Sequence, residues 1–135
     1  MEQLAPFELS MLARTKGFDL RTLYSFTSPG DQEDYIYETL DNGWTIGSYV
    51  EKGWVSDLNY NDLEDEEDDF QVISAPTLEQ IQKWLRDKHQ IYVLVGRADQ
   101  PYLSFECNYT TEIYDTYEEA LVDGLTNALK TLDNG

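Results

Sequence analysis

Carboxylates dominate the side chains of this sequence that could do chemistry. Seven of the eight residues from 62 to 69 are acidic: Asp62, Glu64, Asp65, Glu66, Glu67, Asp68 and Asp69. Calcium prefers such oxygen ligands, and Asp57, Asn59, Asn61 and Asp68 fall at positions 1, 3, 5 and 12 of an EF-hand-like register. Asp62 replaces the glycine of the sharp turn, however, and the final bidentate glutamate is missing. We therefore interpret residues 57–69 as a solvated acidic loop. The alternative is a divalent-cation-responsive module with ligands drawn from Asp57, Asn59, Asn61, Glu64 and Asp68.

Nucleophilic and acid–base catalysis have few candidate residues. Cys107 is the single cysteine and falls inside a predicted strand, where a buried thiol is the usual outcome. His89 is the single histidine and falls at the end of a predicted helix. No spacing singles out two carboxylates for glycosidase-type hydrolysis, which needs one carboxyl group in a desolvated pocket. One cysteine and one histidine cannot complete a tetrahedral zinc site, and no glycine-rich phosphate loop is present. We expect no catalytic residues, no metal and no cofactor.

Positive charge is concentrated in one place, at Lys83, Arg86 and Lys88 beside Trp84. An aromatic side chain among cations could stack on a nucleic-acid base. The sequence as a whole has 27 acidic against nine basic residues, a formal net charge of −18, which repels nucleic acid. We therefore assign these cations to the C-terminal turn of a helix, where they complement the helix dipole.

The acidity extends along the whole sequence. Without the seven acids of residues 62–69, 20 acidic residues still stand against nine basic ones. Aromatic residues make up 13% of the sequence, far more than in a disordered acidic chain. A length of 135 residues suits one domain over residues 1–135. No apolar run is long enough for a membrane span, the acidic N-terminus is not a secretory signal, and the single cysteine fits a reducing compartment. These observations predict a soluble cytoplasmic protein that contacts no membrane.

Helix signals occur at three places. Pro6 opens a predicted helix over about 6–16, which Gly17 ends in a left-handed conformation with Phe18 as the apolar contact. Thr77 and Gln80 form a capping box before a second helix with Leu78, Ile81, Trp84 and Leu85 on one face. Asp115 or Thr116 caps the last helix, whose apolar face is Ala120, Leu121, Leu125, Ala128, Leu129 and Leu132.

Strand patterns fill the intervening segments. Residues 23–26, 35–40, 44–50 and the neighbourhood of 54–55 predict an antiparallel meander with a tight turn at 41–43, and residues 70–73 return to apolar alternation. Residues 91–95 and 102–107 predict a hairpin. The predicted order α-β-β-(β)-α-β-β-α indicates an α+β fold, with an antiparallel sheet of four to six strands and three helices on one face.

Three segments together resemble a known group of proteins. They are residues 7–19, which end in Gly17-Phe18-Asp19; residues 75–89, with an Ala75-Pro76 step before Trp84-Leu85-Arg86-Asp87-Lys88-His89; and residues 114–121, with Tyr117-Glu118-Glu119-Ala120. In this order they resemble small uncharacterised proteins encoded by bacteriophages and prophages of Bacteroidetes hosts. The resemblance covers about a third of the sequence directly, and the acidic loop departs from it. It implies a phage setting inside a host cell and assigns no catalytic residue.

Composition and resemblance together suggest a non-enzymatic phage or prophage accessory protein that acts by binding another protein. Duplex DNA carries one negative charge per about 1.7 Å of its axis, so an acidic domain could compete for a basic DNA-binding cleft. In this sharper form the protein is a DNA mimic that inhibits a nucleic-acid-handling defence enzyme of the host through Asp62, Glu64, Asp65, Glu66, Glu67, Asp68 and Asp69. A purely structural role in the phage is a further alternative.

Overall fold

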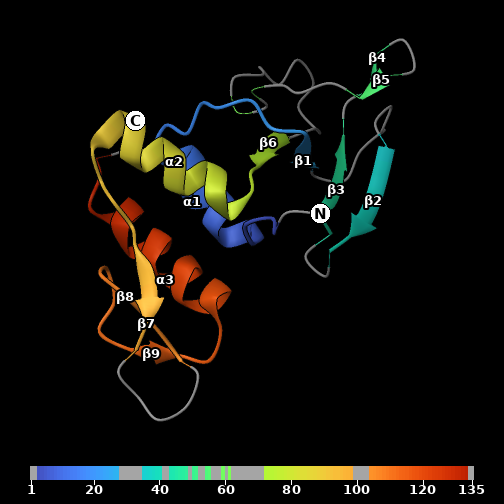
Figure 1. The fold of residues 1–135 in the computed structure, drawn as a ribbon. Helices are drawn as coiled ribbons and strands as arrows, with labels where there is room; N and C mark the ends of the chain where they lie inside the picture. The colour runs from blue at the N-terminus through green and yellow to red at the C-terminus, as the bar shows by residue number, and fades with distance from the viewer. Residues whose placement is uncertain are drawn as a thin grey trace.

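The computed structural model describes residues 3–27, 35–40, 43–48, 50–51, 54–55, 59, 61, 72–98 and 104–133. Within them lie three helices, α1 (Phe7–Thr15), α2 (Leu78–His89) and α3 (Tyr117–Lys130). The strands are β1 (Tyr24–Thr27), β2 (Tyr35–Thr39), β3 (Thr45–Ser48), β4 (Val50–Glu51), β5 (Trp54–Val55), β6 (Val72–Ala75), β7 (Val95–Arg97), β8 (Phe105–Cys107) and β9 (Ile113–Tyr114). All strand pairs are antiparallel, so the predicted α+β class is confirmed (Figure 1).

The helix ends follow the capping chemistry of the sequence. Gly17 has a φ of 95°, and the Phe18 amide donates to the Ala13 carbonyl at 2.9 Å, which completes a left-handed C-terminal cap on α1. At α2 the Gln80 amide donates to Thr77 Oγ1 at 3.1 Å, and the Thr77 amide donates to Gln80 Oε1 at 2.9 Å. Thr116 rather than Asp115 caps α3, through a hydrogen bond from the Glu119 amide. Each helix therefore begins or ends where its cap residues predict.

The larger sheet has the strand order β2-β3-β1-β6. Its four strands fall within the predicted four to six, and β2 and β3 form the predicted hairpin. The prediction of a single sheet with the helices on one face is wrong, because the strands are divided among three sheets and α3 packs on the separate β7-β8-β9 sheet. The predicted meander is wrong about β1, which pairs with β3 and β6 instead of β2. Phe26 of β1 lies opposite both Ile46 and Ile73, and this apolar row packs under Phe7 and Met11 of α1. Burial of Phe26 between two strands favours this order over the sequential one.

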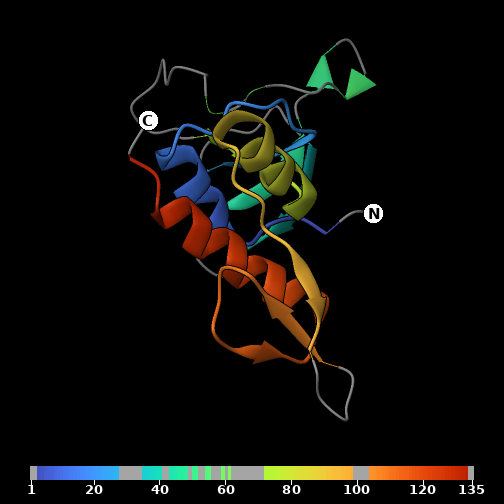
Figure 2. The same ribbon diagram turned by 60° about the vertical axis from the view of Figure 1, so that its left-hand side comes forward.

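A separate three-stranded sheet, β7-β8-β9, packs on α3 (Figure 2). The predicted hairpin is present, but its first strand begins at Val95 instead of Ile91. Before Val95, side chains hydrogen-bond the backbone carbonyls that a neighbouring strand would otherwise have bonded. Gln82 Nε2 donates to the Val93 carbonyl at 2.6 Å, and Asn108 Nδ2 donates to the Tyr92 carbonyl at 2.6 Å. The β4–β5 pair forms the third sheet.

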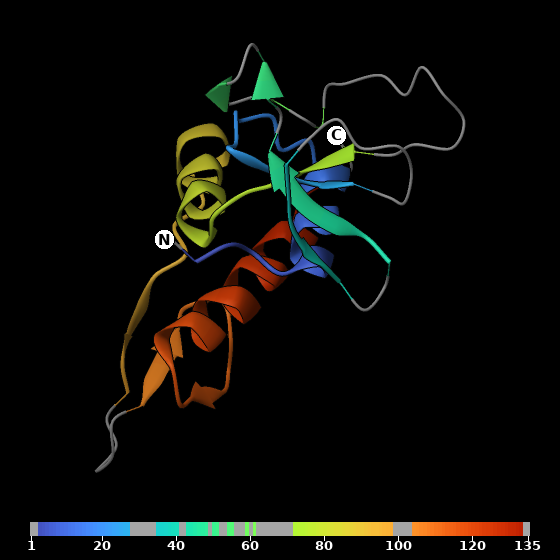
Figure 3. The same cartoon turned by 90° about the vertical axis from the view of Figure 1, so that its right-hand side faces the viewer.

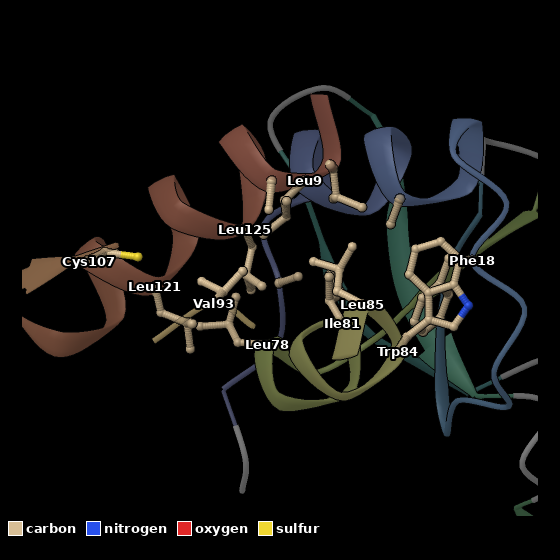
Figure 4. Close-up of a cluster of buried hydrophobic side chains, with 14 of the residues drawn as sticks. Leu9, Phe18, Leu78, Ile81, Trp84, Leu85, Val93, Cys107, Leu121 and Leu125 are labelled. Carbon is tan, nitrogen blue, oxygen red and sulfur yellow. The ribbon is translucent and has the colours of Figure 1, made fainter. Parts of the chain in front are cut away.

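The two larger sheets lie at opposite ends of the molecule, with the helices between them (Figures 1 and 3). Helix α1 contacts β6, α3 contacts β7, β8 and β9, and α3 also contacts both α1 and α2. The main core runs from Cys107, beside α3, through Leu121, Val93 and Leu85 to Trp84 and Phe18 (Figure 4). This core fixes the orientation of the β7–β9 sheet relative to α1 and α2.

Candidate functional site

Of the predicted acidic loop, residues 57–69, the structure describes only residues 59 and 61. Asp62, Glu64, Asp65, Glu66, Glu67, Asp68 and Asp69, proposed as the protein-binding residues, lie outside the described residues, as does Asp57. Asn61 is described, and its side chain ties two segments together. Its Oδ1 accepts from the Ser74 amide at 2.8 Å, and its Nδ2 donates to the Phe18 carbonyl at 3.0 Å. Asn61 therefore serves a structural contact, which counts against its predicted alternative role as a cation ligand.

Cys107 and His89 do not form a catalytic pair. Cys107 lies at the end of the core nearest β8, packed against Gly124 of α3. His89 packs edge-on against Trp84, with ring centroids 4.8 Å apart. Figure 4 shows Cys107 and Trp84 at opposite ends of the core. Across the described part of the chain, no three His, Cys, Asp or Glu side chains gather closely enough to hold a metal ion.

The cations around Trp84 are paired with carboxylates. Lys83 and Arg86 both contact Asp87, and Lys88 Nζ lies 3.2 Å from Asp19 Oδ2. The Trp84 indole donates to Asp19 Oδ1 at 3.0 Å, and the residue is only 2% exposed. A buried indole cannot stack on a nucleic-acid base. The alternative of an aromatic nucleic-acid platform therefore fails at this place.

Charge is divided unevenly among the described residues. Residues 3–27 and 72–90, which we call the basic side, contain four acidic and six basic residues. Residues 91–98 and 104–133, which we call the acidic end, contain two bases, Arg97 and Lys130, against seven acids. All seven acids are exposed: Glu106, Glu112, Asp115, Glu118, Glu119, Asp123 and Asp133. None of the three ion pairs found among the described residues includes any of them.

Local structure accounts for some of these carboxylates. Glu118 and Glu119 lie in the first turn of α3, where negative charge is favoured by the helix dipole. Glu119 also accepts a hydrogen bond from Thr116 Oγ1 at 3.1 Å. Glu106 and Glu112 belong to the β7–β9 sheet and its connecting turn, where no helix dipole stabilises them. These two carboxylates are the better candidates for a binding role.

An open hollow of about 350 Å³ lies between α3 and the turn before β9. It is lined by Thr110, Thr111, Glu112, Tyr114, Asp123, Thr126, Asn127 and Lys130. The pKa of Tyr114 is raised above 10.0, first by burial and then by its hydrogen bond to Asp123, with repulsion from Asp123 and Glu112 adding to the effect. The hollow offers hydrogen-bonding groups for a small polar molecule, and its carboxylates continue the acidic end.

The net charge of the whole chain hides this division. Counting each predicted segment separately finds it: the segment from 104 to 133 has seven acids and one base. The exposed apolar residues of the same region, Tyr92, Leu94 and Ile113, needed the structure, since their alternation also fits a buried strand.

No protein-family model, curated protein or solved structure matches this chain. Among the described helices, none has the length and apolar character that a membrane crossing requires.

Proposed function

We propose that this protein works without catalysis, by binding a basic protein partner through its acidic end. The observation that carries the proposal is the division of charge. The basic side pairs Lys83, Arg86 and Lys88 with carboxylates of its own, whereas the acidic end presents seven exposed carboxylates that none of the three ion pairs includes. A region with excess charge of one sign attracts partners of the opposite sign and speeds their association.

The sharper form of the proposal is a DNA mimic. The partner would then be a nucleic-acid-handling defence enzyme of the host, and the protein a phage or prophage accessory factor in the host cytoplasm. Exposed carboxylates on α3 and on the β7–β9 sheet support this form, because a rigid helix and sheet hold negative charge at fixed positions, as a duplex does. The run of acids at 62–69 adds negative charge to the same chain.

A pull-down from host lysate tests the proposal. The tagged full chain is incubated with lysate at about 50 mM and about 500 mM salt, since screening at the higher value shortens the Debye length to a few ångströms. We expect a basic, nucleic-acid-handling protein to be retained at low salt and released at high salt. Recovery of no such protein, or retention indifferent to salt, contradicts the proposal.

The second candidate, a divalent-cation-responsive module, has one observation in its favour. The Oδ1 atom of Asn59 is buried and has no hydrogen-bond partner among the described residues, so a carbonyl ligand is available there. Calorimetric titration with calcium and with magnesium tests it. Saturable heat that is lost in Asn59→Ala supports a cation site, and the absence of saturable heat removes it.

A further inference from the structure

The outer face of the β7–β9 sheet carries exposed apolar side chains around Glu106, and none of the described elements covers it. The register places Gly96 opposite Glu106, and Glu106 opposite Ile113. The alternate residues Val95, Phe105 and Cys107 pack into the core with α3, so Gly96, Glu106 and Ile113 face away from it. Leu94 joins this outer face, because its amide and carbonyl hydrogen-bond with Asn108, which follows β8.

The apolar side chains of this face are unusually exposed for their size. Leu94 is 61% exposed and Ile113 51%, and Tyr92, two residues before Leu94 in the chain, is 53% exposed. A Cβ atom on Gly96 would meet nothing within 4 Å. Helix α3 covers one face of the sheet, and no described element covers the other (Figures 1 and 2). The face can therefore receive a partner without rearranging the fold.

Glu106 determines what kind of partner fits. It lies in the central strand, between Gly96 on one side and Ile113 on the other, and Leu94 lies diagonal to it, beside Asn108. Anything that covers the two apolar residues also removes water from the Glu106 carboxylate. Burial of an unpaired carboxylate is strongly unfavourable, so the occupant has to bring a cation. Two copies of this chain would instead oppose Glu106 with Glu106 and bring together two molecules of charge −18.

We propose that this outer face docks an amphipathic protein segment that carries Leu-like side chains beside Lys or Arg. Its apolar side chains cover Leu94, Tyr92 and Ile113, and its cation pairs with Glu106. The inference rests on the proposed function, because it assigns the binding site and the chemistry of the same basic partner. The acidic end attracts the segment at long range, and the apolar contacts hold it in place.

Titration of the isotope-labelled full chain with two defined peptides tests the docking site. One is an amphipathic Leu/Lys peptide of about 14 residues, long enough for four helical turns. The other has the same composition with its Leu residues distributed around the helix. We expect chemical-shift changes at residues 92–97, 105–108 and 112–114, and an affinity about tenfold higher for the amphipathic peptide, the equivalent of burying one large apolar side chain.

Two variant pairs localise the effect. Gly96→Lys places a bulky cation in the open space of the face and should weaken binding about tenfold, whereas Gly96→Ala, which adds one methyl group, should not. Leu94→Ser should weaken binding similarly, and Leu23→Ser, at an exposed leucine of the basic side, should not. Circular dichroism spectra and thermal midpoints establish that each variant is folded.

The outcomes separate this inference from the proposed function. Equal binding of both peptides, or wild-type affinity in Gly96→Lys and Leu94→Ser, overturns the docking face and leaves the basic-partner proposal standing. Failure of both peptides to bind at low salt overturns both. Sedimentation of the free chain as a dimer, abolished by Gly96→Lys, would show that a second copy covers the face and would also overturn the inference.

Discussion

The charged side chains of the basic side and of the acidic end differ in their ion pairing. On the basic side, Asp87 lies between Lys83 and Arg86, and Asp19 joins Lys88 to the buried Trp84 indole. On the acidic end, seven exposed carboxylates stand against Arg97 and Lys130. The three ion pairs found among the described residues join Lys83, Arg86 and Lys88 to carboxylates of the basic side, and none of them includes a carboxylate of the acidic end. The net charge of the chain alone hides this difference.

The pKa shifts of Asp87 and Tyr114 show the same difference between the two regions. The pKa of Asp87 is lowered below 3.8, first by its hydrogen bond to Lys83 and further by the charges of Lys83 and Arg86. The pKa of Tyr114 is raised above 10.0 by burial and by Asp123. Neighbouring cations stabilise an anion on the basic side, and a neighbouring carboxylate disfavours one on the acidic end. The local field therefore differs between the two regions.

The largest expected effect is on stability, at the contact between Gly124 of α3 and Cys107 of β8, which holds the elements of the acidic end together. A Cβ atom on Gly124 would lie 2.3 Å from Cys107 Sγ and 3.1 Å from Val93 Cγ1. We expect Gly124→Ala to lower the free energy of unfolding by about 2 kcal/mol, since the overpacking outweighs the gain in helix propensity. Urea unfolding measures the change.

The matched control for Gly124→Ala is the double variant Gly124→Ala with Cys107→Ala. The second change removes the sulfur atom that the new methyl group would meet. It should be more stable than the sum of the two single changes by about 1 kcal/mol. Strict additivity would mean that the close approach of Gly124 and Cys107 does not limit the packing of the acidic end.

A smaller effect is expected on the basic side, at Asp19. Asp19→Ala leaves the Nε1–H group of the buried Trp84 without its acceptor and Lys88 without its partner. We expect a loss of about 1 kcal/mol in the free energy of unfolding. Asp19→Asn keeps an oxygen acceptor for the indole, so most of the stability should return. Equal losses in both variants would assign the effect to the Lys88 ion pair instead.

The smallest effect concerns the titration of Tyr114. Asp123→Asn removes the negative charge beside the phenol, so the Tyr114 pKa should fall back toward 10.0. Because the pKa in the folded protein lies above the unfolded value, the contribution of Tyr114 to stability is complete below the unfolded pKa. It is lost as the pH rises through the folded pKa. Absorbance titration of the tyrosinate, with Tyr114→Phe to assign the signal, measures the shift, and an unchanged pKa in Asp123→Asn would show that burial alone raises it.

Local chemistry made the helices predictable. The Thr77–Gln80 box, the Gly17 C-terminus and the Thr116 cap each depend on residues at most a few positions apart, and the structure contains all three. The antiparallel α+β class followed from the same patterns. The position of β1 between β3 and β6 did not, because it depends on Phe26 meeting residues far away in the sequence.

Side-chain contacts explain the remaining differences. Residues 91–94 have the composition of a strand, yet Gln82 and Asn108 take the backbone groups that strand partners would have used. The two residues of β9 are too few to produce a pattern. Of the candidate site, the sequence predicted only that it is acidic. The division of charge between the two regions can be counted from the sequence. The outer sheet face could be identified only from the burial of Cys107 and the exposure of Leu94.

One comparison of two charge-matched variants tests the central claim most directly. Glu106→Gln with Glu112→Gln removes two charges from the acidic end, and Glu8→Gln with Glu79→Gln removes two from exposed positions on the basic side. Both variants have the same net charge. Affinity for the amphipathic Leu/Lys peptide at about 50 mM salt, where the Debye length is still longer than 10 Å, should fall about tenfold in the first variant and less than twofold in the second. Equal losses in the two variants would contradict the account, because they would show that the binding depends on net charge and not on the acidic end.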